Sequence, residues 1–217
     1  MQLRPPLSPM RRVAIFLRKA GSVNKFRATI LGALRTDLVD NALLCSGFFQ
    51  DNGKYSAGAD FDLISHRKCN PLKITTLGLY SYSWKAQYST FFTQLQAKNK
   101  CPCFSAVQMR IPSMGWHAKV FLAKQGKVPL VGIIGSSNIT RRAFGLDKDF
   151  NYECDVVFWD ESIPDIDRAM SAAIGNPGNI SDVIVTNYDD NHPANREPLQ
   201  DRLSSLEAEI LAKAVNV

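Results

Sequence analysis

Short apolar runs alternate with segments of helical spacing along almost the whole chain. The segments that predict helices are 22–38, 84–98, 138–144, 165–174 and 198–215. The segments that predict strands are 42–49, 73–80, 104–111, 116–124, 128–135, 152–159 and the short 183–186. This alternation predicts an α/β fold, with one mixed central β-sheet flanked by helices on both faces. Ser22 is the expected cap of the first helix.

The chain has 217 residues, enough for one domain with a full core. The prolines at 5, 6 and 9 indicate that residues 1–21 form an extended N-terminal lead-in, so we assign residues 22–217 to a single domain. Residues 51–70 are polar and form an excursion to which the sequence assigns no role.

The net charge of +6 and the pI of about 9.1 favour a polyanionic partner, either nucleic acid or an acidic lipid surface. No apolar stretch reaches the roughly 18 residues of a membrane span. The apolar run 13–17 is too short for a signal peptide, and Arg18 ends it. We therefore expect a cytoplasmic protein that does not enter a membrane.

The cysteines are too scattered, and odd in number, for a disulfide framework. Cys45 and Cys154 lie in apolar runs and are expected in the core. Four further side chains have two possible roles. They either bind a structural zinc ion or lie as reduced, unligated groups on two surface loops. These four are His66, Cys69, Cys101 and Cys103.

His117 and Lys119 are two residues apart on a predicted strand. Side chains alternate along a strand, so both are expected on the same face. An imidazole beside an ammonium suits a nucleophile next to a clamp for phosphate oxygens. A single histidine of this kind is also compatible with a purely structural role.

A turn of small polar residues follows the predicted strand 128–135. Gly135 permits an unusual backbone angle and close approach of a ligand. Ser136 and Ser137 offer hydroxyl and N–H groups, and Asn138 offers its amide. The turn therefore indicates an anion site before a helix. The alternative is an ordinary helix start, capped by Ser137 or Asn138.

Glu153 opens the apolar run that ends at Trp159. A carboxylate that leads into a core strand is costly unless it is paired. A hydrogen bond from a catalytic histidine would pair it and would fix the tautomer of that histidine. Asp155 has the same strand parity, so either carboxylate could face the site.

The order His-x-Lys, Gly-Ser-Ser-Asn and Asn-x-Glu resembles the phospholipase D superfamily, and most of all its bacterial nuclease branch with restriction-endonuclease-like members. The resemblance covers roughly residues 105–160. It implies a phospholipase D-like sandwich and a hydrolase that cleaves phosphodiester bonds without a metal or other cofactor. It also implies that His117 attacks phosphorus to give a phosphohistidine. Lys119, Asn138 and Ser136 would then hold the phosphate oxygens, and Glu153 would orient the histidine.

Two departures from the family pattern matter. Lys124 stands where the longer family motif has an aspartate. The chain also has a single copy of the whole motif set, because its other His-x-Lys pair, His66-Arg67-Lys68, has no Gly-Ser-Ser-Asn turn after it, and His192 belongs to no such pair. Members with one motif complete the site by forming a homodimer. The resemblance therefore implies a homodimer with one active site at the two-fold interface.

DNA, or RNA, is the expected substrate, and the chain is expected to be the catalytic part of a restriction or repair system. The residues expected to contact substrate are Ser137, Arg141, Arg142 and Trp116, although each also suits an ordinary surface or core position. Two alternatives stay open, namely a hydrolase of phospholipids or small phosphodiesters and a non-catalytic DNA-binding subunit. No base-reading module is evident, so sequence specificity is not predicted.

Overall fold

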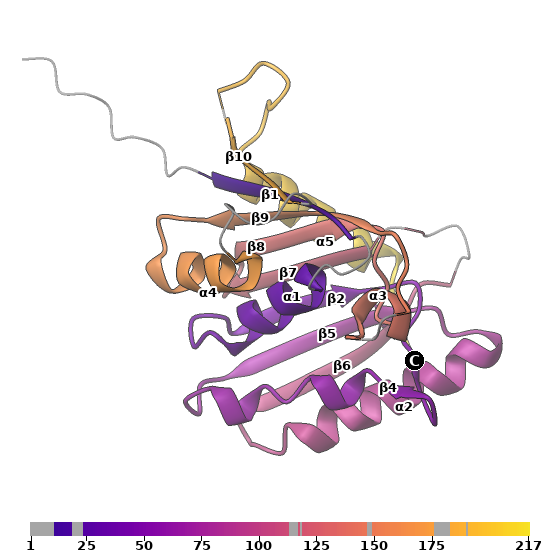
Figure 1. Ribbon diagram of the computed structural model, residues 1–217. Coiled ribbons are helices and arrows are strands. Elements are labelled where there is room, and N and C mark those ends of the chain that lie inside the picture. The colour runs from indigo at the N-terminus through magenta and orange to yellow at the C-terminus, as the bar shows by residue number, and fades with distance from the viewer. Residues whose placement is uncertain are drawn as a thin grey trace, which may run out of the picture.

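A nine-stranded mixed sheet forms the centre of the chain (Figure 1). The computed structural model describes residues 11–18, 24–112, 117, 119–146, 149–175, 183–189 and 191–217. The strands of this sheet are β1 (Arg11–Leu17), β2 (Asn41–Cys45), β5 (Leu72–Gly78), β6 (Phe104–Arg110), β7 (Lys119–Gln125), β8 (Val128–Gly135), β9 (Cys154–Asp160), β10 (Val183–Tyr188) and β11 (Val215–Asn216). Their order is β10-β1-β9-β8-β7-β2-β5-β6-β11.

Helices cover both faces of this sheet. They are α1 (Lys25–Arg35), α2 (Tyr82–Lys98), α3 (Arg141–Phe144), α4 (Pro164–Ile174) and α5 (Leu199–Lys213). Figure 1 shows α1, α2 and α4 in front of the sheet and α5 behind it. The prediction of a mixed α/β fold with helices on both faces is confirmed. None of the helices among the described residues is long and apolar enough to cross a membrane.

The two faces of the sheet bury two separate apolar clusters. On β2, Ala42 and Leu44 pack into the cluster under α1, α2 and α4. Leu43 and Cys45 point the other way, into the cluster under α5. A strand buried on both faces has no polar side to alternate with, so β2 is nearly continuously apolar in sequence.

Strand pairing decides where the two ends of the sheet lie. The β2, β5 and β6 strands run parallel to one another, and β7 is antiparallel to β2. The β8 strand is antiparallel to both β7 and β9. Therefore β2 and β8 finish where β7 and β9 begin. We call this end of the sheet the site end, and the other end the opposite end.

The structure corrects three details of the sequence analysis. Residues 11–17, placed in the lead-in, form β1, which is antiparallel to both β9 and β10. Its apolar Ala14 and Phe16 are buried, so this short run belongs to the sheet rather than to a linker. The cap of α1 is Asn24, whose Oδ1 accepts from the Arg27 N–H at 3.0 Å, and not Ser22. Cys154, expected in the core, is exposed. The domain boundaries remain a prediction.

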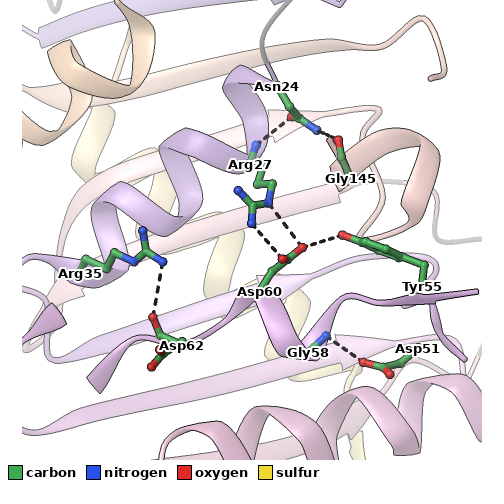
Figure 2. A network of polar contacts seen from close by, with 9 residues as sticks. All are labelled: Asn24, Arg27, Arg35, Asp51, Tyr55, Gly58, Asp60, Asp62 and Gly145. Carbon is green, nitrogen blue, oxygen red and sulfur yellow. Dashed lines mark hydrogen bonds and ion pairs between the residues drawn. The ribbon is translucent and has the colours of Figure 1, made fainter. Parts of the chain in front are cut away.

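The excursion 51–70 is fixed to the helices beside it. It contains the short strands β3 (Asp51–Asn52) and β4 (Tyr55–Ser56) and the 3-10 turns η1 (Gly58–Asp60) and η2 (Ile64–His66). In Figure 2, Asp60 lies between Arg27 of α1 and Tyr55. Its carboxylate accepts from the Arg27 guanidinium at 2.9 Å and from the Tyr55 hydroxyl at 2.8 Å. The Asn52 side chain also donates to the Gln87 Oε1 of α2 at 2.9 Å, so the excursion links α1 and α2.

Candidate active site

The predicted site residues come together at the site end of the sheet, on its α1 face. Lys119 is paired with Gly135 across β7 and β8. Gly135 is paired with Asp155 across β8 and β9. Neighbouring strands lie about 4.8 Å apart, so three motifs that are distant in sequence share one small area. The motifs are brought together by strand register.

Lys119 is the first residue of β7, and its side chain extends over Gly47. A Cβ atom at Gly47 would lie 3.9 Å from the Lys119 Nζ. That ammonium donates to the main-chain oxygen of His117 at 2.5 Å. His117 itself is exposed and precedes the strand. The prediction that His117 and Lys119 project to the same face of a strand therefore does not apply, because His117 lies before β7.

Asn138 also lies next to Gly47. A Cβ at Gly47 would lie 3.2 Å from the Asn138 Oδ1. This oxygen accepts from the Phe48 N–H at 3.1 Å and from the Ser46 hydroxyl at 3.3 Å. Because the oxygen is used to anchor the loop after β2, the amide nitrogen is the part of Asn138 that can donate to a ligand. Gly47 was missed in the sequence, where nothing distinguishes it from a loop glycine.

Gly135 is needed for a different reason from the one predicted. Its φ does not lie in the left-handed region, so no unusual backbone angle is involved. Instead a Cβ at this position would lie 2.0 Å from the Asp155 Oδ1. Only glycine lets this carboxylate pack under the turn.

Ser137 is part of the support of the turn and does not reach substrate. It is 1% exposed, which contradicts its predicted substrate contact. Its hydroxyl donates to the Asp155 Oδ2 at 2.6 Å, and its N–H donates to the Oδ1 at 3.2 Å. Burial raises the pKa of Asp155 to about 6, although the Ser137 hydrogen bonds oppose that rise. Asp155 therefore holds the turn from below.

Glu153 contacts the turn and not the histidine. Its carboxylate accepts from the Ser136 hydroxyl at 2.5 Å and from the Asn151 side chain at 3.1 Å. Within the described part of the chain it makes no hydrogen bond to His117, so the predicted Glu153–His117 pair is not formed in this structure. The Ser136 hydroxyl also accepts from the Cys154 N–H at 3.0 Å. Ser136 thus connects Glu153 to the turn.

Arg18 is a basic residue beside the site that the sequence analysis did not assign to it. Its guanidinium donates to the carbonyl oxygens of Ala143 at 2.6 Å and Gly145 at 3.2 Å. Burial lowers the pKa of Arg18, while the nearby carboxylates of Glu153 and Asp155 raise it. Its only sequence signal was its place at the end of an apolar run. It fixes the end of α3 next to the site.

The remaining substrate-contact predictions have separate outcomes. Arg141 forms an ion pair with Asp149 at 2.8 Å, so its positive charge is partly neutralised by that carboxylate. The side chain of Arg142 is exposed at the start of α3. Trp116 lies outside the described residues. Arg142 is therefore the arginine of this pair that is better placed to meet a phosphate.

Lys124, at the position of the family aspartate, lies at the opposite end of β7. Five residues of strand separate it from Lys119, or about 17 Å. Its ammonium contacts both carboxylate oxygens of Glu207 on α5, at 2.6 and 2.7 Å. Lys124 is only 7% exposed. This lysine therefore joins the sheet to α5 and takes no part in the site.

No protein-family model matches the sequence, and no curated protein does. NucT from Helicobacter pylori is 12% identical, with a TM-score of 0.43 over 76% of this chain and 94% of that one. Phosphatidylserine synthase from Haemophilus influenzae Rd KW20 is 12% identical, with a TM-score of 0.44 over 96% of this chain and 49% of that one. Yeast tyrosyl-DNA phosphodiesterase is 11% identical, with a TM-score of 0.33 over 67% of this chain and 31% of that one. The chain thus spans half or less of the last two. At these scores the likeness establishes no family, and the activity has to be argued from the site.

Proposed function

We propose that this protein is a metal-independent phosphodiesterase of the phospholipase D type, and specifically a nuclease that hydrolyses DNA. The observation that carries the proposal is the meeting of Lys119 and Asn138 around Gly47, beside the exposed His117. An ammonium and an amide N–H stabilise the charge that builds on phosphate oxygens during phosphoryl transfer. The lack of a side chain at Gly47 lets both groups approach the loop after β2 closely.

The reaction proceeds in two displacements. A ring nitrogen of His117 attacks phosphorus, a P–N bond forms, and the P–O bond to the leaving strand breaks. The leaving oxygen takes a proton from a general acid. Water then attacks phosphorus, the P–N bond breaks, and the same acid, now a base, takes the proton from water. The histidine returns unchanged.

The general acid is proposed to be the partner's His117. Only one of the two His-x-Lys pairs, the one at His117, is followed by a Gly-Ser-Ser-Asn turn, and His66 of the other pair lies before β5, away from the site. A two-fold axis through the site would place a second copy of His117 across the phosphate. The loop between α3 and β9 supports an interface here, because Leu146 is 72% and Tyr152 is 78% exposed. The active unit is therefore proposed to be a homodimer with one composite site.

Ser136 and Glu153 take modified roles in this proposal. The Ser136 hydroxyl already donates to Glu153, so it is not the first donor to phosphate. Glu153 acts on the site by holding Ser136, and thus the turn that carries Asn138. A direct hydrogen bond from His117 to the Glu153 carboxylate is expected only after substrate and partner have arrived, since catalytic hydrogen bonds often tighten at that stage.

DNA is proposed as the substrate because of charge. The chain carries a net charge of +6, and Arg142 presents an exposed guanidinium next to the turn. Contacts of this kind bind a phosphate backbone without reading its sequence. A place in a restriction or repair system would supply the missing sequence specificity from another subunit. RNA, and phospholipid vesicles, are the competing substrates in the test below.

The experiment is cleavage of supercoiled plasmid in excess EDTA by the wild type, His117→Ala and His192→Ala. His192 is a matched control, because it is an exposed histidine outside the site. We expect nicking by the wild type and His192→Ala, and a loss of at least about 10³-fold in His117→Ala. Circular dichroism in the same buffer confirms that each variant is folded.

Three other results would contradict the proposal in different ways. Turnover of phosphatidylcholine vesicles in preference to DNA would make the protein a lipid hydrolase. Preference for RNA would change the substrate and keep the mechanism. DNA binding by folded wild type with no cleavage of any substrate would make it a binding subunit.

A further inference from the structure

Three cysteine sulfurs gather at the opposite end of the sheet, away from the candidate active site. Cys69 precedes β5, while Cys101 and Cys103 precede β6. All three sulfur atoms lie within 4.8 Å of one another. We call these residues the thiol cluster. The two loops that carry it are close because β5 and β6 are paired in parallel from their first residues, Leu72 and Phe104.

Cys101 and Cys103 form a disulfide in this structure, which the sequence analysis did not expect. The Cys69 sulfur lies 3.2 Å from that of Cys101. Cys101 also accepts a hydrogen bond from the Cys103 N–H at 3.3 Å. An N–H that points at sulfur stabilises a thiolate and is typical of the surroundings of metal-bound cysteine.

Two polar side chains hold the loops of the thiol cluster in place. Arg67 donates to three carbonyl groups at and just after the end of α1, those of Leu34, Thr36 and Val39. Asn99 is 2% exposed and has its whole amide satisfied by backbone groups of η2, α2 and Phe61. Cys69 is two residues from Arg67, and Cys101 is two residues from Asn99. Side-chain hydrogen bonds to the backbone therefore fix both segments that carry the thiol cluster.

Zinc is the metal that matches this donor set. A tetrahedral Zn²⁺ has Zn–S bonds of about 2.3 Å, which place its sulfurs about 3.8 Å apart. The Cys69–Cys101 separation of 3.2 Å and the 4.8 Å upper limit both lie within about 1 Å of that value. Reduction of the Cys101–Cys103 disulfide frees the other two sulfurs to move apart. Lys68 and Lys100 stand next to Cys69 and Cys101 in sequence, and their positive charges would offset the net negative charge of a zinc ion with three thiolates.

We propose that the reduced thiol cluster binds one structural Zn²⁺ through Cys69, Cys101 and Cys103. A dithiol reductant supplies two electrons and two protons to the Cys101–Cys103 disulfide, which gives two thiols. Zinc then binds as three thiols release three protons, and three Zn–S bonds form. The oxidised chain keeps too few thiolates to hold the ion. His66 lies outside the group whose donor atoms are within 4.8 Å of one another, so the fourth ligand is water unless His66 moves to the ion.

This zinc stabilises the fold and takes no part in catalysis. The β5 strand has seven residues, so the cluster is about 20 Å from the site end. Bound zinc would tie the segment before β5 to the segment before β6. It therefore stabilises the folded state by mass action, and the inference does not depend on the proposed nuclease activity.

The test measures zinc in protein purified with a phosphine reductant and dialysed against trace Zn²⁺. We expect about one ion per chain in the wild type. The matched control Cys154→Ser removes an exposed free cysteine elsewhere and should keep the ion. The Cys69→Ser variant should bind zinc at least about 10-fold more weakly. Titration with Co²⁺ should give the thiolate-to-cobalt absorption of three sulfurs, and His66→Ala reads out the fourth ligand.

Two results would overturn the inference. The first is folded, fully reduced wild type that binds neither Zn²⁺ nor Co²⁺. The second is Cys69→Ser protein that binds zinc as tightly as the wild type. If Cys69→Ser does not fold, the cobalt spectrum of the wild type still shows whether three thiolates bind the metal. Slow loss of zinc in EDTA should lower the melting temperature, and this is separate from any effect on phosphodiester cleavage.

Discussion

Two lysines on the same strand show how differently the two ends of the sheet are used. Lys119 opens β7 at the site end, and its ammonium contacts only a main-chain oxygen two residues away among the described groups. Lys124 lies at the opposite end, where its ammonium donates to both carboxylate oxygens of Glu207. A charge with a dedicated, buried partner stabilises a fold. A charge at the surface without a carboxylate partner is available to a ligand.

The comparison explains the departure from the family motif. An aspartate at position 124 would face Glu207, and two carboxylates at that distance repel each other. The lysine converts this contact into an attractive one between β7 and α5. A lysine at this position is therefore compatible with the proposed active site about 17 Å away.

The largest effect on stability is expected for Lys124→Met. The change leaves Glu207 partly buried without its partner, which costs about 3–5 kcal/mol. The melting temperature should fall by roughly 6–20 °C. Scanning calorimetry measures it. The control Arg168→Met breaks an exposed pair with Asp165 and should cost less than about 1 kcal/mol.

A double change makes this prediction sharper. Lys124→Met with Glu207→Leu should recover most of the lost stability, because no unpaired charge remains. Both variants should keep the wild-type cleavage rate at a temperature where they are folded. A loss of cleavage in the folded double variant would show that Lys124 acts in the site, and the contrast between the two lysines would be wrong.

Lys119→Ala should have the reverse profile. We expect about a 10²- to 10³-fold loss of cleavage rate, since one donor to the phosphate oxygens is removed. The melting temperature should hardly change. Lys127→Ala, an exposed lysine in the turn after β7, is the control and should retain activity. An equal loss of rate and stability in Lys119→Ala would mean that this lysine is structural as well.

The fold could be predicted further than the site. Apolar runs and helical spacing located most of the strands and helices, because burial on both faces leaves a strong mark in sequence. Residues 11–17 were misplaced, because a short strand after prolines resembles a linker. Their assignment depends on pairing with β9 and β10, and pairing over more than 140 residues of sequence has no local signal.

For the candidate site, the sequence predicted the groups but not how they are paired. His117, Lys119 and Asn138 remain predictions from motif spacing and resemblance, and the structure places the last two near each other. Glu153 and Asp155 show the limit of parity arguments. Parity left both carboxylates open to face the site, but Glu153 precedes β9, and the burial of Asp155 makes it the support of the turn. Gly47 could be found only in three dimensions, because its importance lies in what surrounds it.

Asp155 offers the smallest and most specific effect, a change in the pH dependence of stability. Burial raises its pKa from 3.8 to about 6, so the folded state binds a proton more tightly than the unfolded state. The resulting stabilisation is complete below the unfolded value of 3.8 and is lost as the pH rises through about 6. In this window the unfolding free energy should fall by up to about 1.4 kcal/mol per pH unit. Asp155→Asn should remove that slope.

Urea unfolding in steps across this window measures the slope. Asp201→Asn removes an exposed carboxylate on α5 and should leave the pH dependence of the unfolding free energy due to Asp155 unchanged. Parallel curves for wild type and Asp155→Asn across the whole window would show that this carboxyl does not titrate there.

The most direct test of the account is to trap the covalent intermediate. Excess wild-type protein is mixed with a DNA oligonucleotide, quenched in alkali, where a P–N bond survives, and analysed by peptide mass spectrometry. The account predicts one nucleotide adduct, on His117, which is missing from His117→Ala and present in Lys124→Met with Glu207→Leu. Cleavage without an adduct on His117, or cleavage by His117→Ala at the wild-type rate, would contradict it.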